Sequence, residues 1–529
     1  MPFYLINHGT ALSRMTAAGV ATALTLPNGV TVNSSRPPRS VVWGREVITA
    51  NSVTRPLATT RNYHPRLLGL RAPATAPVLT ATGSGTLSGT FKVRVTFIIK
   101  DEWGRLVSES GFGPESATSA SLSNQQLLAS GVPLSSDTVP TGFTMARRLY
   151  RTATGPGTEY FPWVDVDDNV ITTVQNDLSD AAIGLVSAPV LGDVPDLYLM
   201  AEFRQRLWGV SRLDKNVVRY TEADKNYAWS ALNTLPIPRI GQDDRGVIQV
   251  MARREGLGVG RQNSLHQITG NSSRDFRRQT ISEMVGLEGD EAVAVSENTV
   301  FFLWKDGVYQ WDSGGVTCLS DKKVRTWFTK DDTFNRARFR YAKMEVNPLR
   351  NCLTILLAAA GSSVEDRWVE YSFADQTWWG PHKTDATTPT CLEMAYDANN
   401  QPIWIMGTSD GFLLTEQATR TDYASTGIAF DVMGKFHDMN TPDIWKVFGQ
   451  LSLLSKIQAA GTLTVTPYVG GLDASAGTAI SADMTLGKQV LRRLGLGRFA
   501  RLNFTHSTNA QDVELFGYEL GFFEIGKRG

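Results

Sequence analysis

The stretch VFFLWKDGVYQWDSGG, residues 300–315, predicts a β-hairpin and decides the fold class. An apolar run at 300–304 leads into Lys305-Asp306-Gly307, and an alternating run follows at 308–311. β-Branched and aromatic residues suit a pleated surface, and Asp-Gly is a strong hairpin-turn signal. We therefore expect two antiparallel strands joined by a tight turn in which Gly307 provides the positive φ.

The same pattern of two short apolar strands recurs along the chain. The further pairs are residues 206–210 with 217–221, 256–260 with 264–270, 353–357 with 368–372, and 402–407 with 410–414. The second strands, marked by Tyr220, His266, Tyr309, Tyr371 and Leu413, follow one another at steps of 46, 43, 62 and 42 residues. A four-stranded propeller blade takes about 40–50 residues. The repeat therefore predicts an all-β protein with a β-propeller of about six blades, whose blades occupy residues 196–423.

Composition fits a large, turn-rich globular protein. Of the 529 residues, 42% are hydrophobic, 47 are Gly and 23 are Pro, and a chain of this length divides into several domains. Lys plus Arg and Asp plus Glu both number 52, so no overall charge attracts nucleic acid or anionic lipid. No apolar run approaches the roughly 18–20 residues of a membrane span. The three cysteines are widely separated, which argues against a disulfide framework or a zinc site.

Three further segments surround the repeat. Residues 1–72 contain turn signals for hairpins at 24–32 and 40–49, and we expect their strands to contribute to the propeller or to form an arm. Residues 78–190 lie between two Pro-containing linkers and carry several short alternating runs, which predict an inserted immunoglobulin- or fibronectin-like β-sandwich. Residues 424–529 predict a C-terminal β-sandwich whose apolar last strand is held in a sheet.

The signature motifs for a bound phosphate and for a catalytic zinc are absent from the sequence. Neither G-x-x-x-x-G-K-[ST] nor H-E-x-x-H is present, and we predict no enzyme, no cofactor and no metal site. Asp165, Asp167 and Asp168 offer oxygen ligands for calcium, but they lack the EF-hand pattern and a solvated loop is the preferred interpretation.

Two other polar candidates have ordinary interpretations. Asp243 and Asp244 are adjacent, which does not hold two carboxylates across a scissile bond, so a loop is expected. His266 lies in an alternating run, where we expect a hydrogen-bonded structural histidine.

Clustered arginines are the most informative polar residues. The clusters are Arg253-Arg254, Arg274 with Arg277-Arg278, Arg336 with Arg338 and Arg340, and Arg492-Arg493 with Arg498 and Arg501. On a strand, alternation would place Arg336, Arg338 and Arg340 on one face. Such a row suits contacts to phosphates that are independent of base sequence. The last two clusters are therefore candidates for a DNA channel or for intersubunit contacts, and a solvated charged face is the alternative.

Residues 203–210, 258–270 and 302–312 together resemble the tail nozzle or hub proteins of short-tailed bacteriophages, including the tail tubular protein B and packaged-DNA stabilisation families. The closing segments 497–504 and 514–520 are similar to the end of such proteins, so the resemblance spans roughly residues 200–529. Fibronectin-like insertions also recur in phage tail proteins.

The resemblance implies a structural subunit of the virion tail, made in the host cytoplasm. It implies a homo-oligomeric ring, a hexamer, below the portal and adaptor. DNA would pass along the axis of this ring without sequence-specific contacts, and the ring would help to retain packaged DNA. Partners would be the tail adaptor and the tail fibre or needle proteins.

Two other classes remain open at the level of sequence. A carbohydrate-binding or carbohydrate-cleaving propeller would use some of the 13 Trp and 14 Tyr as sugar platforms, although aromatic residues are equally expected in blade cores. A peripheral receptor-binding tail propeller would share the virion location without the channel.

Overall fold

The computed structural model describes residues 3–526 except 17–19, 28–29, 33–37, 52–53, 156, 185, 190, 242, 244, 384–386, 398, 417–421, 424–425, 428–429, 509–510 and 512. The chain divides into two compact units, Met1–Thr415 and Glu416–Gly529. The all-β prediction is confirmed, because the helices in the described part of the chain are three short ones: α1 (Asp180–Ile183), α2 (Arg325–Thr329) and the 3-10 helix η1 (Arg336–Tyr341). Within the same residues, no helix has the length and apolar character needed to cross a bilayer.

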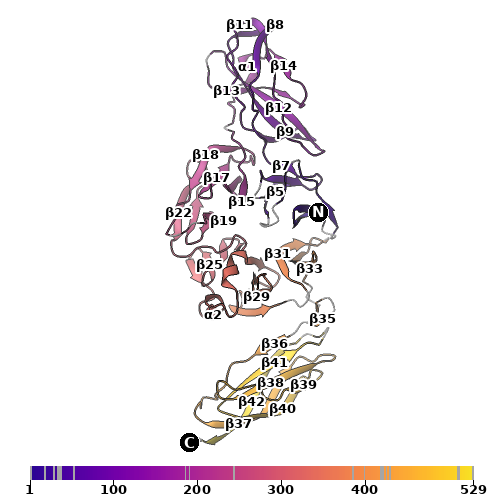
Figure 1. Ribbon diagram of the computed structural model, residues 1–529, viewed down its shortest axis with the longest axis vertical. Coiled ribbons are helices and arrows are strands. Elements are labelled where there is room, and N and C mark those ends of the chain that lie inside the picture. The colour runs from indigo at the N-terminus through magenta and orange to yellow at the C-terminus, as the bar shows by residue number, and fades with distance from the viewer. Residues whose placement is uncertain are drawn as a thin grey trace. The chain divides into compact units, whose positions relative to one another are not determined.

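The larger part of the first unit is a series of small antiparallel sheets (Figure 1). Their strands are β15 (Leu197–Phe203), β16 (Arg206–Ser211), β17 (Val217–Thr221), β18 (Trp229–Pro236); β19 (Val247–Ala252), β20 (Leu257–Arg261), β21 (Leu265–Thr269), β22 (Arg277–Ser282); β23 (Val293–Ser296), β24 (Thr299–Trp304), β25 (Gly307–Asp312), β26 (Gly315–Cys318); β27 (Lys343–Asn347), β28 (Cys352–Leu357), β29 (Arg367–Ser372), β30 (Thr377–His382); and β31 (Pro389–Tyr396), β32 (Pro402–Thr408), β33 (Leu413–Thr415). Within each sheet the strands pair in chain order. Each predicted hairpin forms the second and third strands of one sheet, so the repeat pattern located the sheets correctly.

The hairpin expected at residues 300–315 forms as predicted, but Gly307 has a different role in it. Val300 pairs with Trp311 and Trp304 with Gly307, which leaves Lys305 and Asp306 as the turn. The φ of Gly307 lies outside the left-handed range. A Cβ at this position would instead lie 2.3 Å from the Ser320 hydroxyl oxygen, so close approach rather than backbone twist requires glycine here.

Hydrophobic cores lie between successive sheets and bury both faces of most strands. Trp208 is buried in the core shared by the β15–β18 and β19–β22 sheets, and Trp311 is buried in the next core. The first strands of neighbouring sheets also contact each other, β15 with β19, β23 with β27, and β27 with β31. A sheet covered on both faces needs apolar residues at successive positions, which explains runs such as 300–304.

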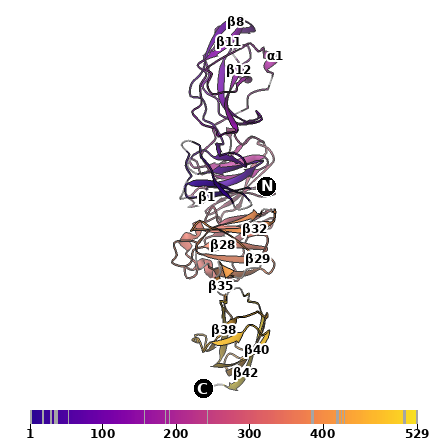
Figure 2. The same ribbon diagram turned by 90° about the vertical axis from the view of Figure 1, so that its right-hand side faces the viewer.

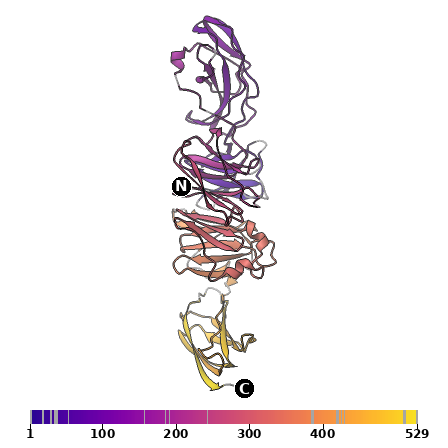
Figure 3. The same ribbon diagram turned by 90° about the vertical axis from the view of Figure 1, so that its left-hand side faces the viewer.

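The longest step in the repeat contains the helical segment. Between β26 and β27 the chain forms α2 and η1, which lie on the outside of the strands (Figure 3). Phe328, Phe334 and Phe339 from this segment are buried in the core between the β23–β26 and β27–β30 sheets. The extra residues of the 62-residue step therefore complete a core instead of adding a strand.

Residues before the linker form two sheets of their own. Their strands are β1 (Phe3–His8), β2 (Ala11–Thr16), β3 (Ala21–Ala23), β4 (Arg39–Trp43), β5 (Glu46–Ala50), β6 (Leu57–Thr60) and β7 (Arg66–Leu67). The β4–β5 hairpin confirms the expectation for 40–49. The hairpin expected at 24–32 is wrong: residues 24–27 and 30–32 are not strands, and its turn residues 28–29 lie outside the described residues. Leu24 and Val32 are instead buried against Leu57.

The sheet of β4–β7 lies beside the β15–β18 sheet. β15 contacts β4 and β5, and Ile48 shares a core with Leu197 and Trp229. The sheet of β1–β3 reaches the other end of the series, because the Tyr4 hydroxyl hydrogen-bonds to the backbone of Tyr396 on β31.

The inserted segment forms two sheets that enclose one core (Figure 2). Its strands are β8 (Val78–Gly89), β9 (Val93–Asp101), β10 (Leu106–Glu109), β11 (Leu122–Ser130), β12 (Phe143–Thr152), β13 (Tyr160–Val166) and β14 (Thr173–Asn176). One sheet has the order β10-β9-β12-β13 and the other β14-β11-β8. Phe91, Leu149 and Trp163 are buried between them.

The second unit also has two sheets around one core. Its strands are β34 (Asp422–Tyr423), β35 (Thr426–Gly427), β36 (Phe430–Met433), β37 (Trp445–Ser455), β38 (Thr462–Gly470), β39 (Ile480–Asp483), β40 (Lys488–Gly497), β41 (Phe499–His506) and β42 (Leu515–Gly526). The orders are β36-β41-β38-β39 and β40-β37-β42, and β34 pairs with β35. β42 pairs along β37, which confirms that the apolar C-terminal segment is held in a sheet.

Candidate functional site

The arginine row expected at 336–340 is not on a strand. Arg336, Arg338 and Arg340 belong to the 3-10 helix η1, and at three residues per turn alternate residues do not share a face. Burial of Phe339 in the core sets this local conformation. Arg338 pairs with Glu365 at 2.6 Å.

The other two guanidinium groups of η1 make weaker contacts. Arg336 donates to the backbone oxygen of Lys305 at 3.2 Å. The exposed Arg340 lies 4.6 Å from the centre of the Tyr341 ring, in cation–π range. Of the three arginines, Arg338 is therefore the one held by an ion pair.

The C-terminal arginines lie in the other unit. Arg492 and Arg493 are on β40, where Arg492 is opposite Gln450 of β37 in the backbone register. Arg498 follows β40, and its guanidinium lies 5.8 Å from the Trp445 ring centre.

Arg501 on β41 is held by aromatic rings. Its guanidinium lies 4.4 Å from the ring centre of Phe436 and 4.9 Å from that of Tyr468. Such stacking fixes the direction of the side chain. Contacts of this kind position Arg501 within its own unit.

A basic pocket in the first unit was not predicted. Its volume is about 610 Å³, and it is lined by Glu202, Phe203, Arg204, Gln205, Ala252, Arg253, Arg254 and Asn271. The turn after β15 contributes Arg204 and the turn after β19 contributes Arg253 and Arg254. Because β15 and β19 are the first strands of neighbouring sheets and contact each other, their following turns lie at the same edge.

The sequence pattern indicated one of the two turns that form this pocket. The Arg253-Arg254 cluster was recognisable, whereas Arg204, in the run Phe203-Arg204-Gln205-Arg206, was not singled out as a member of a cluster. The usable signal was positional: in the two repeats that begin with β15 and β19, arginine directly follows the first strand. Equivalent turns of successive sheets come together when the sheets pack side by side.

Arg253 is the buried arginine of the pocket. Its side chain is 4% exposed, its Nε donates to the backbone oxygen of Asn298 at 2.9 Å, and its guanidinium lies 3.9 Å from the Trp311 ring centre. Burial lowers the pKa of Arg253, and the charges of Glu255 and Asp312 partly oppose that change. Its Nη1 is buried without a hydrogen-bond partner in the described structure.

A second, largely apolar pocket lies among first strands. About 430 Å³ in volume, it is lined by residues of β4, β15, β19 and β23, among them Val41, Met200 and Val293. Near the beginnings of β4, β23 and β27, Arg39 pairs with Asp290 at 3.2 Å and with Glu291 at 3.0 Å. Lys343 also pairs with Glu291 at 3.0 Å. These ion pairs join the N-terminal sheet to sheets about 250 residues later in the chain.

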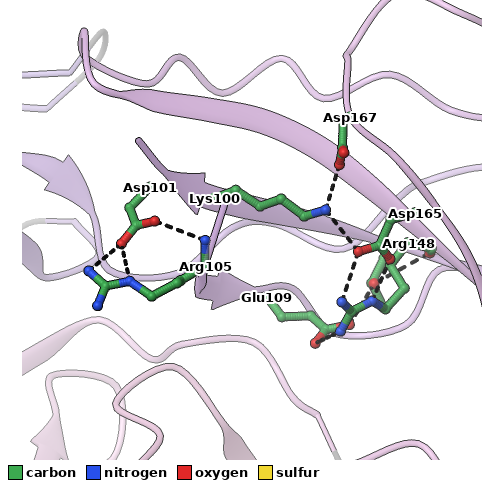
Figure 4. Close-up of polar contacts among 8 residues, drawn as sticks. Lys100, Asp101, Arg105, Glu109, Arg148, Asp165 and Asp167 are labelled. Atoms are coloured by element: carbon green, nitrogen blue, oxygen red, sulfur yellow. Dashed lines mark hydrogen bonds and ion pairs between the residues drawn. The ribbon is translucent and has the colours of Figure 1, made fainter. Parts of the chain in front are cut away.

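The three aspartates of the inserted segment are ion-paired. Arg148 Nε lies 2.7 Å from Asp165, and Lys100 lies 3.0 Å from Asp165 and 2.5 Å from Asp167 (Figure 4). Burial alone would raise the pKa of Asp165, but hydrogen bonds from Arg148 and Lys100 hold this pKa below its usual value. Cationic side chains therefore occupy the positions that a calcium ion would need.

The remaining aspartate of this group, Asp168, also has a structural role. It pairs with the buried Arg147 at 2.7 Å and accepts hydrogen bonds from the backbone N–H groups of Val170 and Ile171. Over the described residues no group of three His, Cys, Asp or Glu side chains is arranged to hold a metal ion. These aspartates stabilise the inserted segment, and the solvated-loop interpretation understated their contacts.

A buried carboxyl group completes the network of Figure 4. Glu109 accepts hydrogen bonds from Thr96 at 2.8 Å and Tyr150 at 2.6 Å, and Arg148 lies 3.7 Å away. Burial raises the pKa of Glu109, and the hydrogen bond from Tyr150 partly offsets this. Burial and the Glu109 charge together raise the pKa of Tyr150 as well. The Glu109 side chain is 1% exposed, so this carboxyl group is a buried structural member of the network.

The other polar candidates are structural as well. Asp243 is fully buried and pairs with Arg261 at 2.6 Å, while Asp244 lies outside the described residues. His266 is hydrogen-bonded to Ser264 and Thr280. Burial, with the charges of Arg278 and Arg261, lowers the pKa of His266 to about 4, so this histidine is neutral at physiological pH.

The structure defines an all-β protein assembled from many small antiparallel sheets. No protein-family model matches the chain, and no curated protein matches it. Among solved structures, it is similar to an exo-β-1,3-galactanase from Phanerochaete chrysosporium crystallised with β-1,3-galactotriose. The identity is 9%, the match covers 63% of this chain and 96% of that chain, and the TM-score is 0.23. A likeness at this level carries no statement about activity.

Proposed function

We propose that this chain is a structural, ring-forming subunit of the tail nozzle or hub of a short-tailed bacteriophage. In this proposal, the sheets that begin with β4, β15, β19, β23, β27 and β31 are six blades of a propeller. The inserted segment is a fibronectin-like domain, and the second unit is a β-sandwich. The resemblance of residues 200–529 to nozzle proteins supports it, as do the contacts between successive sheets.

The proposal that copies of this chain associate rests on the outer face of the β40-β37-β42 sheet. Leu496 and Phe523 are both paired with Val447 in the register of the sheet, and directly paired residues share a face. These three side chains are 42%, 74% and 38% exposed. The row is apolar and open to solvent, as a surface that packs against another chain would be.

The edges of the same sheet favour a second copy of this chain as the partner. In the described structure, β40 and β42 are each paired on one side only. β40 carries Lys488, Arg492 and Arg493, whereas β42 carries Glu519 and Glu524. If the β40 edge of one copy lies beside the β42 edge of the next, unlike charges face each other. The unpaired backbone N–H and C=O groups of the two edges then gain hydrogen-bond partners. Contacts of this head-to-tail kind close into a ring when the rotation between copies allows it.

The arginine clusters have a place in this proposal. Arg492 and Arg493 belong to the β40 edge proposed to meet the next copy, and Arg498 directly follows that strand. Arg501 lies on β41 of the other sheet and is stacked on Phe436 and Tyr468, so it is assigned to no contact between copies. The η1 arginines are candidates for the DNA channel, and the exposed Arg340 is the strongest of them because Arg338 is already paired with Glu365. DNA must slide along such a channel, so few and non-specific phosphate contacts suit it.

Sedimentation and negative-stain imaging of the intact chain test the proposal. We expect a closed ring of six copies for the wild type, and we expect Phe523→Glu to dissociate it, since a charge in a packed apolar contact is costly. Leu472→Glu is the matched control, because Leu472 is 66% exposed in the loop after β38.

Each outcome of this experiment is informative. A wild-type chain that stays monomeric at its highest soluble concentration would contradict the proposal, as would a Phe523→Glu variant that assembles as well as the control. In virions, labelling at the tail axis supports a nozzle, and labelling of a lateral appendage supports a receptor-binding protein instead.

A further inference from the structure

We propose that the pocket between the turns after β15 and β19 is a binding site for a phosphate group. Arg204, Arg253 and Arg254 line it together with a single carboxylate, that of Glu202. No other carboxylate lines the pocket in the described structure, so positive charge dominates it. This inference does not depend on the proposed ring.

Arg253 is held in place but incompletely hydrogen-bonded. The Trp311 ring covers its guanidinium, and the Asn298 carbonyl oxygen accepts from its Nε. Its Nη1 is left without a partner in the described structure, although the side chain is almost completely buried. A buried donor without an acceptor is unfavourable. Because Arg253 is one of the residues that line the pocket, an anionic oxygen that reaches its guanidinium from the pocket would provide that acceptor.

The other side chains supply charge and further donors. Arg204 and Arg254 are exposed at the rim, and the Arg204 guanidinium lies 5.3 Å from the ring centre of Phe203, which also lines the pocket. Gln205 and Asn271 add amide groups. The Glu202 carboxylate accepts from the backbone N–H of Gln205 at 3.1 Å, so it holds the turn in shape.

These features select a phosphate group over other ligands. Guanidinium groups donate to phosphate oxygens in paired, directional hydrogen bonds. The positive charge of three guanidinium groups also matches a phosphate dianion more closely than it matches the single negative charge of a carboxylate ligand. The volume of about 610 Å³ falls within the usual range for small-ligand sites. The phosphate group can belong to a small molecule or to the backbone of DNA, and the chemistry of recognition is shared.

The test is calorimetric titration of the intact chain at low ionic strength, with inorganic phosphate in one arm and a short DNA duplex in the other. The variants are Arg204→Gln and Arg254→Gln, whose side chains are exposed, so that the fold is preserved. Arg212→Gln is the control: this exposed arginine lies in the loop after β16, outside the pocket.

We expect saturable phosphate binding that each pocket variant weakens by about tenfold, the loss typical of one charge-assisted contact. The control should bind as the wild type does. Duplex binding weakened by the same variants identifies the DNA backbone as a source, and binding of inorganic phosphate alone identifies a small molecule. Absence of binding in both arms, or equal binding by all variants, would overturn the assignment.

Discussion

Loss of the buried pair between Asp243 and Arg261 is expected to destabilise the first unit strongly. The two side chains are 0% and 1% exposed, and Arg261 Nε lies 2.6 Å from the Asp243 carboxylate. Arg261 also donates to Asn216 and to the backbone oxygen of Ile237, so it joins two neighbouring sheets. Removing one partner of a buried pair costs about 3–5 kcal/mol, because the other charge is left uncompensated.

The expected shift in melting temperature follows from the size of the unit. The entropy of unfolding is about 2.1 cal/mol/K per residue, and the unit spans Met1–Thr415. Asp243→Asn should therefore lower the Tm of the first unit by roughly 3–6 °C. Differential scanning calorimetry of the intact chain measures this shift.

Two further variants make the reasoning refutable. Asp321→Asn removes a pair with Arg325 in which the side chains are 48% and 52% exposed, and it should leave the Tm unchanged, because solvent screens exposed pairs. The double variant Asp243→Leu with Arg261→Met should recover much of the loss, since an apolar replacement removes both buried charges. If Asp243→Asn shifts the Tm no more than Asp321→Asn does, the pair does not stabilise the junction of the two sheets.

Two other outcomes are expected. Gly307→Ala should lower the free energy of unfolding by about 1–3 kcal/mol, because the added Cβ would lie 2.3 Å from the Ser320 hydroxyl oxygen. Gly449→Ala is the neutral control, since no atom lies within 4 Å of its added carbon. Equal urea midpoints for the two variants would contradict the steric argument. Burial and the nearby Glu393 charge raise the pKa of Glu345 to about 7, so the folded state binds the extra proton and stability falls as pH rises from about 4.5 to 7. Glu345→Gln should therefore stabilise the protein by about 1–3 kcal/mol at pH 8 and leave it unchanged at pH 4; an equal gain at both pH values would refute the titration of this group.

Local signals in the sequence located the strands well. Alternation, β-branched residues and turn residues act within a few positions, so the five hairpins were correctly placed, including β24 with β25. The same local reasoning was wrong where a distant contact decides the conformation. Gly307 meets Ser320, thirteen positions later, and Phe339 is buried between two sheets, which makes 336–341 a 3-10 helix despite its alternating arginines.

The candidate site was only partly visible in the sequence. Arg253 and Arg254 are adjacent and were recognised as a cluster, whereas Arg204 lies almost fifty positions earlier. The η1 and C-terminal clusters were recognised too, but they fall in separate units. A count of charges along the chain does not show which turns come together.

The sequence by itself determined an all-β chain of serial hairpins, because strand propensity, period-two alternation and Gly-containing turns act between near neighbours. Only the tertiary structure decided that the turns after β15 and β19 form one pocket, that Asp243 pairs with Arg261, and that Arg253 is buried against Trp311. These contacts depend on which sheets pack side by side. That choice is made by cores in which each sheet contributes only part of the apolar surface.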